Sequence, residues 1–270
     1  MIVALAAAVL VLAGPPATPP HDLRFSWEGD GGATVALGAL WIGSELEKKR
    51  LAPSSCRWCD SVPGVDETAR ERWKWSAPGR ADAISSGIAF AGIPAALLGV
   101  DAWMASRDGV PRDFPKDGVM IVEAAVAAAA LNQTVKFAVG RERPFVHALP
   151  ADQKGDTADP ADNDLSFYSG HATLAFSLAA ASATVAQERG YRDAWVMWPV
   201  GMSAAAAVAY LRVAADKHWL TDVATGAVAG TAIGIAAPRL LHPRNDAAAP
   251  ASMTVLPAKR GTVLQVAFVF

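Results

Sequence analysis

Long apolar stretches separated by short polar connections make up most of the chain beyond about residue 80. The segments 83–100 and 195–211 contain no charged residue, and each stretch is apolar on most of its helical faces. Prolines, glycines and acidic clusters punctuate the connections, as expected between helices. The pattern therefore predicts one shorter helix followed by five long ones. The predicted ranges are 34–48, 82–106, 118–140, 169–187, 194–214 and 218–241.

The two ends of the chain have other patterns. Residues 2–13 form an apolar run too short to span a bilayer comfortably, and a proline-rich stretch follows, which indicates a secretory signal or an uncleaved anchor. After residue 252, β-branched and aromatic residues flank a Lys-Arg-Gly turn, a pattern typical of a β-hairpin. The predicted fold class is all-α: a bundle of about six helices with the active site at one end, plus a short C-terminal β-hairpin.

These patterns divide the chain into four parts. They are a signal peptide or N-terminal anchor (1–20), a polar N-terminal segment (21–80), a helical core (81–242) and a C-terminal tail with the hairpin (243–270). The polar segment holds the only two cysteines, Cys56 and Cys59, which cannot by themselves complete the four-ligand set of a structural zinc. A short-loop disulfide is the prediction, and a reduced, unpaired pair is the alternative.

Composition narrows the class of protein. Among 270 residues, 52% are hydrophobic and 19% are charged, which excludes a disordered chain and favours extensive burial in protein or lipid. The formal charge of −2 offers no global basic field for nucleic acid. Alanine dominates the helices and is only marginally membrane-seeking. The charge-free segments and the mean hydropathy of +0.23, high for a soluble enzyme, nonetheless favour membrane helices and leave a soluble bundle open.

Two groups of residues suited to anion binding stand near helix ends. Lys136 and Arg143, which precedes a proline, are separated by six residues at the end of a predicted helix, where two cations can hold one anion. Ser169, Gly170 and His171 stand at the start of the next helix, where backbone N–H groups and the helix dipole favour an anion. Each group taken singly is also typical of an ordinary helix end.

A third group completes the pattern. Arg212 is followed by His218 and, four residues later, by Asp222, a spacing that places the carboxylate on the same helical face as the imidazole. Because neighbouring helices in a bundle run antiparallel, all three groups are expected at one end. That convergence favours a functional site over three unrelated helix ends.

The three groups resemble the signature of a known family, the type 2 phosphatidic acid phosphatase and vanadium-dependent haloperoxidase superfamily. Its motifs are Lys-x6-Arg-Pro, Pro-Ser-Gly-His and Ser-Arg-x5-His-x3-Asp, and the resemblance covers about residues 80–240. Tyr168 replaces the proline of the second motif and Leu211 the serine of the third. Both departures bear on substrate fit and loop shape rather than on charged or proton-transferring groups.

The resemblance implies a role for each residue. His218 would attack phosphorus to give a phosphohistidine while Asp222 holds its ring, and His171 would protonate the leaving oxygen and then activate water. The groups implied to bind the phosphoryl oxygens are Lys136, Arg143, Arg212, the Ser169 hydroxyl and the Gly170 N–H. Phosphoryl transfer depends chiefly on cations and oriented N–H donors, which agrees with this set. No metal and no cofactor is expected, and the acidic connection 150–165 is expected to be a solvated loop.

The expected function is a metal-independent phosphatase acting on phosphate monoesters, with phosphorylated lipids of the phosphatidic acid or isoprenoid pyrophosphate type as its substrates and no nucleic-acid partner. The expected location is the inner membrane, with the active site on the periplasmic face. The alternative is a soluble periplasmic non-specific acid phosphatase acting on small molecules. A vanadate-dependent haloperoxidase and an inactive anion-binding protein are less favoured, because the chain is compact and the set of polar residues is intact.

Overall fold

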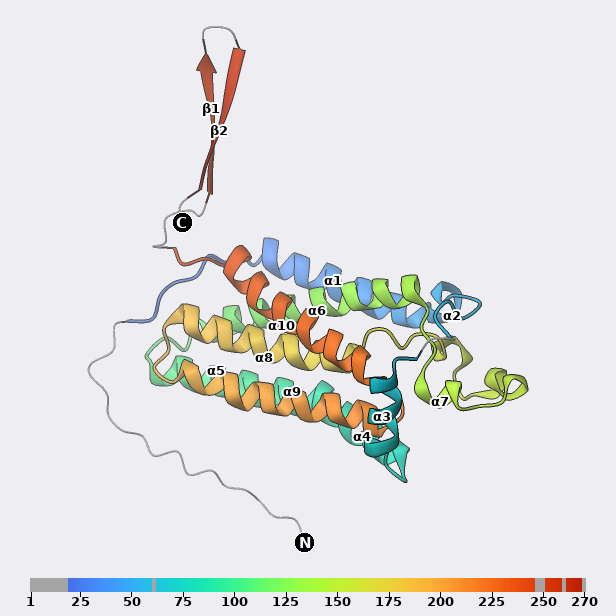
Figure 1. Cartoon of the computed structure of the whole chain (residues 1–270). Coiled ribbons are helices and arrows are strands. Elements are labelled where there is room, and N and C mark those ends of the chain that lie inside the picture. Colours follow the sequence, from blue (N-terminus) through green and yellow to red (C-terminus); the bar gives the residue numbers. More distant parts are fainter. Residues whose placement is uncertain (1–18, 60–61, 246–250, 259–260, 269–270) are drawn as a thin grey trace.

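The computed structural model describes residues 19–59, 62–245, 251–258 and 261–268, and its helices form an elongated bundle (Figure 1). The α-helices are α1 (Gly29–Leu46), α2 (Lys48–Leu51), α3 (Gly64–Trp73), α4 (Pro78–Gly87), α5 (Ile93–Arg107), α6 (Phe114–Val139), α7 (Pro144–His147), α8 (Gly170–Arg189), α9 (Met197–Ala214) and α10 (Leu220–Leu241). A π-helical turn, η1 (Ile88–Gly92), joins α4 to α5 without a break. Three 3-10 turns lie in the connections: η2 (Ala151–Asp156), η3 (Pro160–Asp162) and η4 (Ala194–Val196).

The all-α class is confirmed, whereas the expected count of about six helices is not, because the described residues form ten α-helices. The sequence pattern missed α3, a polar helix without an apolar stretch, and the four-residue helices α2 and α7. Helix α6 begins at Phe114, before the predicted start at 118, because Pro115 lies in its first turn, where the missing N–H is tolerated.

Helix α8 forms the centre of the bundle. Most of its residues are buried, and α6, α9 and α10 pack around it. Three glycines of α10 face α8 at intervals of four residues: Gly226, Gly230 and Gly234. A methyl group at Gly230 would lie 2.4 Å from the carbonyl oxygen of Thr173, so only glycine permits this approach of two backbones. The close crossing brings the start of α10 against the start of α8, where the backbone N–H of Ser169 donates to the carbonyl of Asp222 at 3.1 Å.

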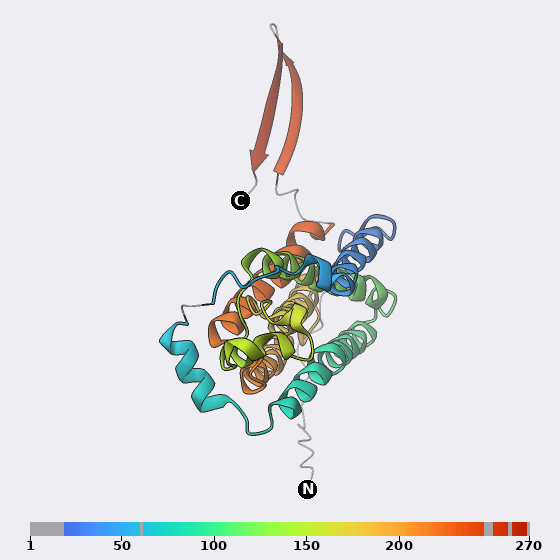
Figure 2. The same ribbon diagram turned by 90° about the vertical axis from the view of Figure 1, so that its right-hand side faces the viewer.

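Helix α6 carries the chain to the same end. Gly140 follows its last turn with φ 61°, a left-handed conformation that ends the helix and turns the chain sharply into residues 141–143. Helix α1 packs along α6, and α2 lies at the end where α6 finishes. The starts of α8 and α10 and the ends of α6 and α9 therefore meet at the end of the bundle that faces the viewer in Figure 2.

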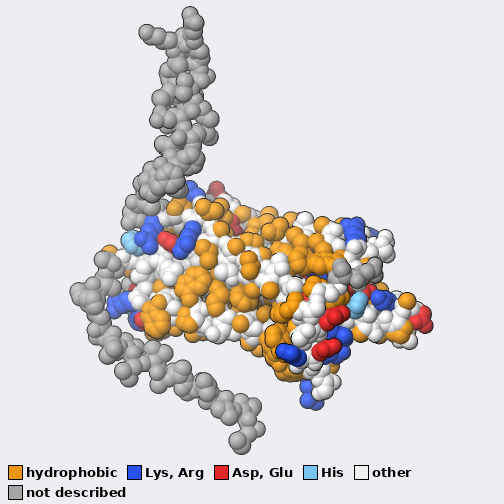
Figure 3. Space-filling model, viewed as in Figure 1, with side chains coloured by type: hydrophobic (Ala, Val, Ile, Leu, Met, Phe, Trp, Pro, Cys, Tyr) orange, Lys and Arg blue, Asp and Glu red, His pale blue; other side chains and the backbone are white. Residues whose placement is uncertain are grey.

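Four helical segments are long and apolar enough to cross a membrane: Pro78–Arg107, Phe114–Val139, Ala194–Ala214 and Leu220–Leu241. Figure 3 shows hydrophobic side chains spread along the side of the bundle, with charged groups gathered toward its two ends. This distribution is the one that the predicted membrane setting requires.

The chain termini leave two predictions open. The predicted signal or anchor falls largely on residues 1–18, which lie outside the described residues. In the tail, β1 (Ala251–Ala258) pairs antiparallel with β2 (Gly261–Phe268). The predicted turn includes residues 259 and 260, which also lie outside the described residues, so the hairpin stays a prediction, as does the division into four parts.

Candidate active site

The three predicted groups surround one cavity of about 290 Å³ at this end of the bundle. Six of the eight predicted catalytic and phosphate-binding residues line it: Lys136, Arg143, Gly170, His171, Arg212 and His218. Ser169 and Asp222 are fully buried behind the lining residues. The structure therefore brings the predicted set together, but it separates residues that face the cavity from residues that hold them.

The imidazole of His218 has a defined tautomer. Its Nδ1 lies 2.8 Å from the carbonyl oxygen of Ser166, and because a carbonyl only accepts, Nδ1 carries the hydrogen. Its Nε2 is therefore a bare lone pair, which lies 3.2 Å from Nη1 of Arg143. Burial, together with the charges of Arg143, Arg212 and Lys136, holds the pKa of His218 well below its ordinary value, which favours the neutral ring.

Asp222 supports this ring differently from the prediction. Its nearest oxygen lies 3.7 Å from Nδ1 of His218, which is too far for a hydrogen bond but close enough for electrostatic stabilisation of an imidazolium. The carboxylate instead accepts from the Ser166 hydroxyl at 2.5 Å and from the backbone N–H of Trp219 at 2.9 Å. The expectation that Asp222 holds the ring directly is corrected: the carbonyl of Ser166 does so, and Asp222 holds Ser166.

The guanidinium of Arg143 is aimed by its neighbours. It donates to the side chain of Asp162 at 2.9 Å and to the carbonyls of Asp162 and Lys217, each at 2.8 Å. Although burial acts to raise it, the net pKa of the Asp162 carboxyl lies below its ordinary value because of the charges of Arg143, Lys136 and Lys48. Asp162 belongs to the acidic connection expected to be a solvated loop, and that expectation is wrong for this residue.

Arg212 and Lys136 complete the cationic wall. Arg212 donates to Asp82 and, at 3.0 Å, to the Ser85 hydroxyl, while its buried Nε has no partner among the described residues. The described residues likewise provide no hydrogen bond or ion pair to the ammonium of Lys136. An unpartnered buried donor and an unpaired cation beside one cavity are the features expected of an anion site.

The charge of the lining also favours an anion. Its four cations are Lys48, Lys136, Arg143 and Arg212, and its two carboxylates are Glu45 and Asp162, so the lining carries a net charge of +2 with its histidines neutral. The local field is therefore opposite in sign to the net charge of the whole chain.

The start of α8 adds oriented backbone dipoles. Ser169 is the N-cap, and its Oγ accepts from the N–H of Ala172 at 3.4 Å, so its hydroxyl serves the helix rather than the cavity. Gly170 lines the cavity, and a methyl group there would lie 3.0 Å from Oδ1 of Asn132. The bare backbone therefore leaves the positive end of a 20-residue helix open toward the cavity.

His171 faces the cavity from the first turn of α8. Its Nε2 lies 3.1 Å from Oγ of Ser86, and its ring packs edge-on against Phe90 at a centroid distance of 4.9 Å. Phe90 belongs to the π-helical turn η1, a kind of distortion that is frequent at functional sites. Neither neighbour carried a signal in the sequence, because both lie about 80 residues before the histidine.

A disulfide between Cys56 and Cys59 closes a short loop beside the site. The loop pairs with the chain that follows α6, since the N–H of Glu142 donates to the carbonyl of Trp58 at 3.2 Å. The indole of Trp58 covers the guanidinium of Arg141, whose centre lies 4.2 Å from the ring centroid. The polar N-terminal segment thus packs directly on the residues between Lys136 and Arg143.

Comparison with known proteins identifies the bundle. Residues 118–246 match the family model described as the PAP2 superfamily. The region that carries the three motifs therefore matches the superfamily that they predicted. An undecaprenyl-diphosphatase from Sulfolobus acidocaldarius is 31% identical over 116 residues, which are 43% of this chain and 51% of that protein, so the match spans about half the length of the relative.

A solved structure resembles the chain over a longer range. A transmembrane PAP2 type phosphatidylglycerolphosphate phosphatase from Bacillus subtilis covers 78% of this chain and 94% of its own, with 16% sequence identity and a TM-score of 0.47.

Proposed function

We propose that this chain is a lipid phosphate phosphatase that reacts through a phosphohistidine on His218. The observation that carries the proposal is the His218 ring, whose Nδ1–H is held by a carbonyl and whose Nε2 lone pair lies beside Arg143 at a cavity of positive charge. A nucleophile oriented in this way needs no further base, and the surrounding donors match the charge of a phosphoryl group.

The reaction has two displacements. In the first, Nε2 of His218 bonds to phosphorus, and the bond from phosphorus to the leaving oxygen breaks. The bound phosphate anion offsets the cations that lower the pKa of His171, so His171 is protonated in the complex and delivers a proton to that oxygen. In the second, His171 takes a proton from water, the water oxygen bonds to phosphorus, and the phosphorus–nitrogen bond breaks. Arg143, Arg212 and Lys136 neutralise the phosphoryl oxygens in both steps, together with the N–H of Gly170.

The lipid substrate is inferred from the surroundings of the cavity. The lining includes three apolar residues, Trp41, Phe90 and Ala129, beside its cations. Four helices long and apolar enough to cross a membrane support a setting in which an acyl or isoprenoid chain can reach that lining. The named activity of the archaeal relative, hydrolysis of undecaprenyl diphosphate, agrees with a substrate of this class. We therefore favour phosphatidic acid or an isoprenoid diphosphate, processed on the periplasmic face of the inner membrane.

The test is hydrolysis by the purified full-length protein in detergent, with excess chelator present. Phosphatidic acid, an isoprenoid diphosphate and a soluble aryl phosphate are compared, and rapid quenching into base traps the phosphohistidine. We expect chelator-resistant turnover with kcat/KM at least ~10-fold higher for a lipid substrate, because binding of the remote chain contributes to transition-state stabilisation.

Equal kcat/KM for the aryl phosphate and the lipids would favour the soluble acid phosphatase instead. Loss of turnover that returns only with added magnesium or zinc would contradict the metal-independent mechanism. No hydrolysis of any of the three substrates, with tight binding of vanadate retained, would favour the haloperoxidase or the inactive anion-binding protein.

A further inference from the structure

Two buried carboxylates hold the guanidinium of Arg141 between them, directly behind the nucleophilic histidine. Nη1 donates to Asp222 at 2.6 Å and Nη2 donates to Asp66 at 2.7 Å. Arg141 is 2% exposed, and both carboxylates are fully buried. None of the three lines the cavity, so this charge cluster does not bind the phosphoryl group.

The cluster reaches His218 through Ser166. The hydroxyl of Ser166 donates to Asp222 at 2.5 Å, and its backbone N–H donates to the carbonyl of Arg141 at 2.9 Å. Its own carbonyl is the acceptor that fixes the tautomer of His218. Arg141 therefore supports Ser166, and with it the carbonyl that holds the ring, in two ways. Its backbone carbonyl accepts from the Ser166 N–H, and its guanidinium binds Asp222, which accepts from the Ser166 hydroxyl.

Asp66 anchors the cluster from another part of the chain. It lies in α3, outside the region that matches the superfamily, and its carboxylate accepts from the backbone N–H of Thr221 at 2.8 Å. The hydroxyl of Thr221 donates to Asp66 at 2.7 Å and accepts from Arg141 at 2.8 Å. One aspartate thus ties α3 to the first turn of α10 and to the guanidinium.

We propose that Asp66 and Arg141 are positioning residues for the phosphatase reaction, and that they hold the Ser166 carbonyl, and through it the His218 ring, in the orientation for attack. This inference rests on the proposed function of His218. It makes the polar N-terminal segment a part of the machinery, since that segment supplies Asp66 and also the Trp58 indole that covers Arg141.

The alternative is a merely structural role, in which the cluster only docks α3 on the bundle. The two roles differ in what they do to kcat. A displaced ring lowers the rate of attack while the phosphoryl-binding cations stay in place, so kcat falls and KM changes little. Loss of docking lowers the folded fraction without changing the turnover of each folded molecule.

The experiment compares Asp66→Asn, Arg141→Gln and Arg141→Lys with the full-length wild type. We expect Asp66→Asn and Arg141→Gln each to lower kcat by about 10- to 100-fold, when kcat is calculated from the concentration of sites that can be phosphorylated. KM should stay within about threefold of the wild-type value. Arg141→Lys keeps the charge but cannot bridge two carboxylates, so it should recover only part of the loss. The matched control is Asp117→Asn, a fully buried carboxylate bonded to Arg189 at the other end, which should keep the wild-type kcat.

The pH dependence of kcat/KM gives a second test of the positioning role, through the pH at which activity falls on the acid side. The charged and titratable groups facing His218 are Arg143, Arg212, Lys136, His171 and Asp222, and none of them is changed in these variants. Removing the positive charge of Arg141 raises the pKa of His218 and moves this fall to higher pH, whereas removing the negative charge of Asp66 moves it to lower pH. Water entering a loosened site would instead move the fall to higher pH in both variants, toward the ordinary pKa of histidine.

A readout without turnover separates this inference from the proposed function. The chain has five histidines, so ¹⁵N-labelled imidazole signals can be assigned to His218 by their loss in His218→Gln. Wild type should show Nδ1 protonated and Nε2 bare, and Asp66→Asn should show a mixture of tautomers. An unchanged tautomer together with unchanged kcat would overturn the positioning role even if the phosphatase activity stands. A changed tautomer in a protein without phosphatase activity would refute only the function.

Discussion

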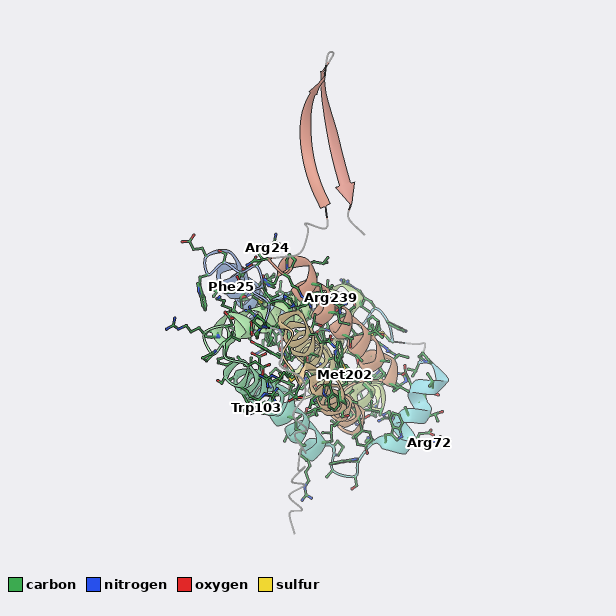
Figure 4. All side chains as sticks on the ribbon, turned by 90° about the vertical axis from the view of Figure 1, so that its left-hand side faces the viewer. Arg24, Phe25, Arg72, Trp103, Met202 and Arg239 are labelled. Atoms are coloured by element: carbon green, nitrogen blue, oxygen red, sulfur yellow. A yellow bond between two sulfur atoms is a disulfide. The ribbon has the colours of Figure 1, made fainter. Side chains whose placement is uncertain are left out.

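Both ends of the bundle bury charged side chains, and at the active-site end several of these charges line the cavity of about 290 Å³. At the other end, which Figure 4 views, Arg189 donates to Asp117 at 2.6 Å, and Tyr191 donates to the second oxygen of the same carboxylate at 2.7 Å. His242 lies between Glu123, 3.0 Å from its Nε2, and the carbonyl of Arg24, 3.1 Å from its Nδ1. Each of these groups has a hydrogen-bond partner, although the neighbouring buried carboxylate of Asp101 has none among the described residues.

At the active-site end, the corresponding histidine and cations line the cavity. Nε2 of His218 accepts from Arg143, which itself lines the cavity, and the ammonium of Lys136 has no ion pair among the described residues. His242, by contrast, lies between a carboxylate and a backbone carbonyl. The difference teaches that a buried histidine or arginine does not by itself mark a site. A reactive site requires that the charges be left short of partners beside a space that a ligand can enter.

The largest expected difference between the two ends concerns the histidines. His218→Gln should lower kcat/KM by at least ~10³-fold and abolish the trapped phosphoenzyme, because it removes the nucleophile. His242→Gln should lower the melting temperature and keep the turnover of each folded molecule. Turnover per phosphorylatable site and thermal unfolding are measured on both variants. A phosphoenzyme that survives in His218→Gln would transfer the role to another residue.

The arginines provide the next comparison. Arg143→Gln should lower kcat/KM by about 10²- to 10³-fold, since the guanidinium stabilises charge that grows in the transition state. Arg189→Gln should instead lower the free energy of unfolding by about 3–5 kcal/mol, because the buried carboxylate of Asp117 loses its counter-charge. Steady-state kinetics and denaturant unfolding separate the two effects. Similar losses of kcat/KM in both variants would remove the distinction between the two ends.

Glycine substitutions midway between the two ends are expected to have the smallest effect on catalysis. Gly230→Ala places a methyl group 2.4 Å from the carbonyl oxygen of Thr173 and should destabilise the bundle by about 1–3 kcal/mol. Gly99→Ala, also within a helix but with no atom within 4 Å, should stabilise it by about 0.4–1 kcal/mol. Unfolding midpoints of the two variants measure this contrast. A Gly230→Ala protein as stable as wild type would show that α8 and α10 do not need their close crossing.

The sequence by itself determined the long helices and the members of the candidate site. Apolar stretches of helical length depend only on neighbouring residues, and so do the spacing of Lys136 and Arg143 and the four-residue step from His218 to Asp222. The superfamily was predicted from these local patterns, and the family model matched it. Helix α3 was missed because its composition is polar and its anchoring residue, Asp66, has partners only in distant segments.

Only the tertiary structure decided how the members of the candidate site are held. Asp66 and Arg141 are 75 residues apart, and Ser166 precedes the histidine that it orients by 52 residues. Asp162 was one of five aspartates in an acidic connection, and nothing in the sequence distinguished the one that aims Arg143. Hydrogen bonds of this kind form when helices pack, and they involve ordinary polar residues whose position along the chain carries no periodic signal. Local sequence pattern could therefore name six of the residues that line the cavity, while the packing of α3, α6, α8 and α10 selected the residues behind them.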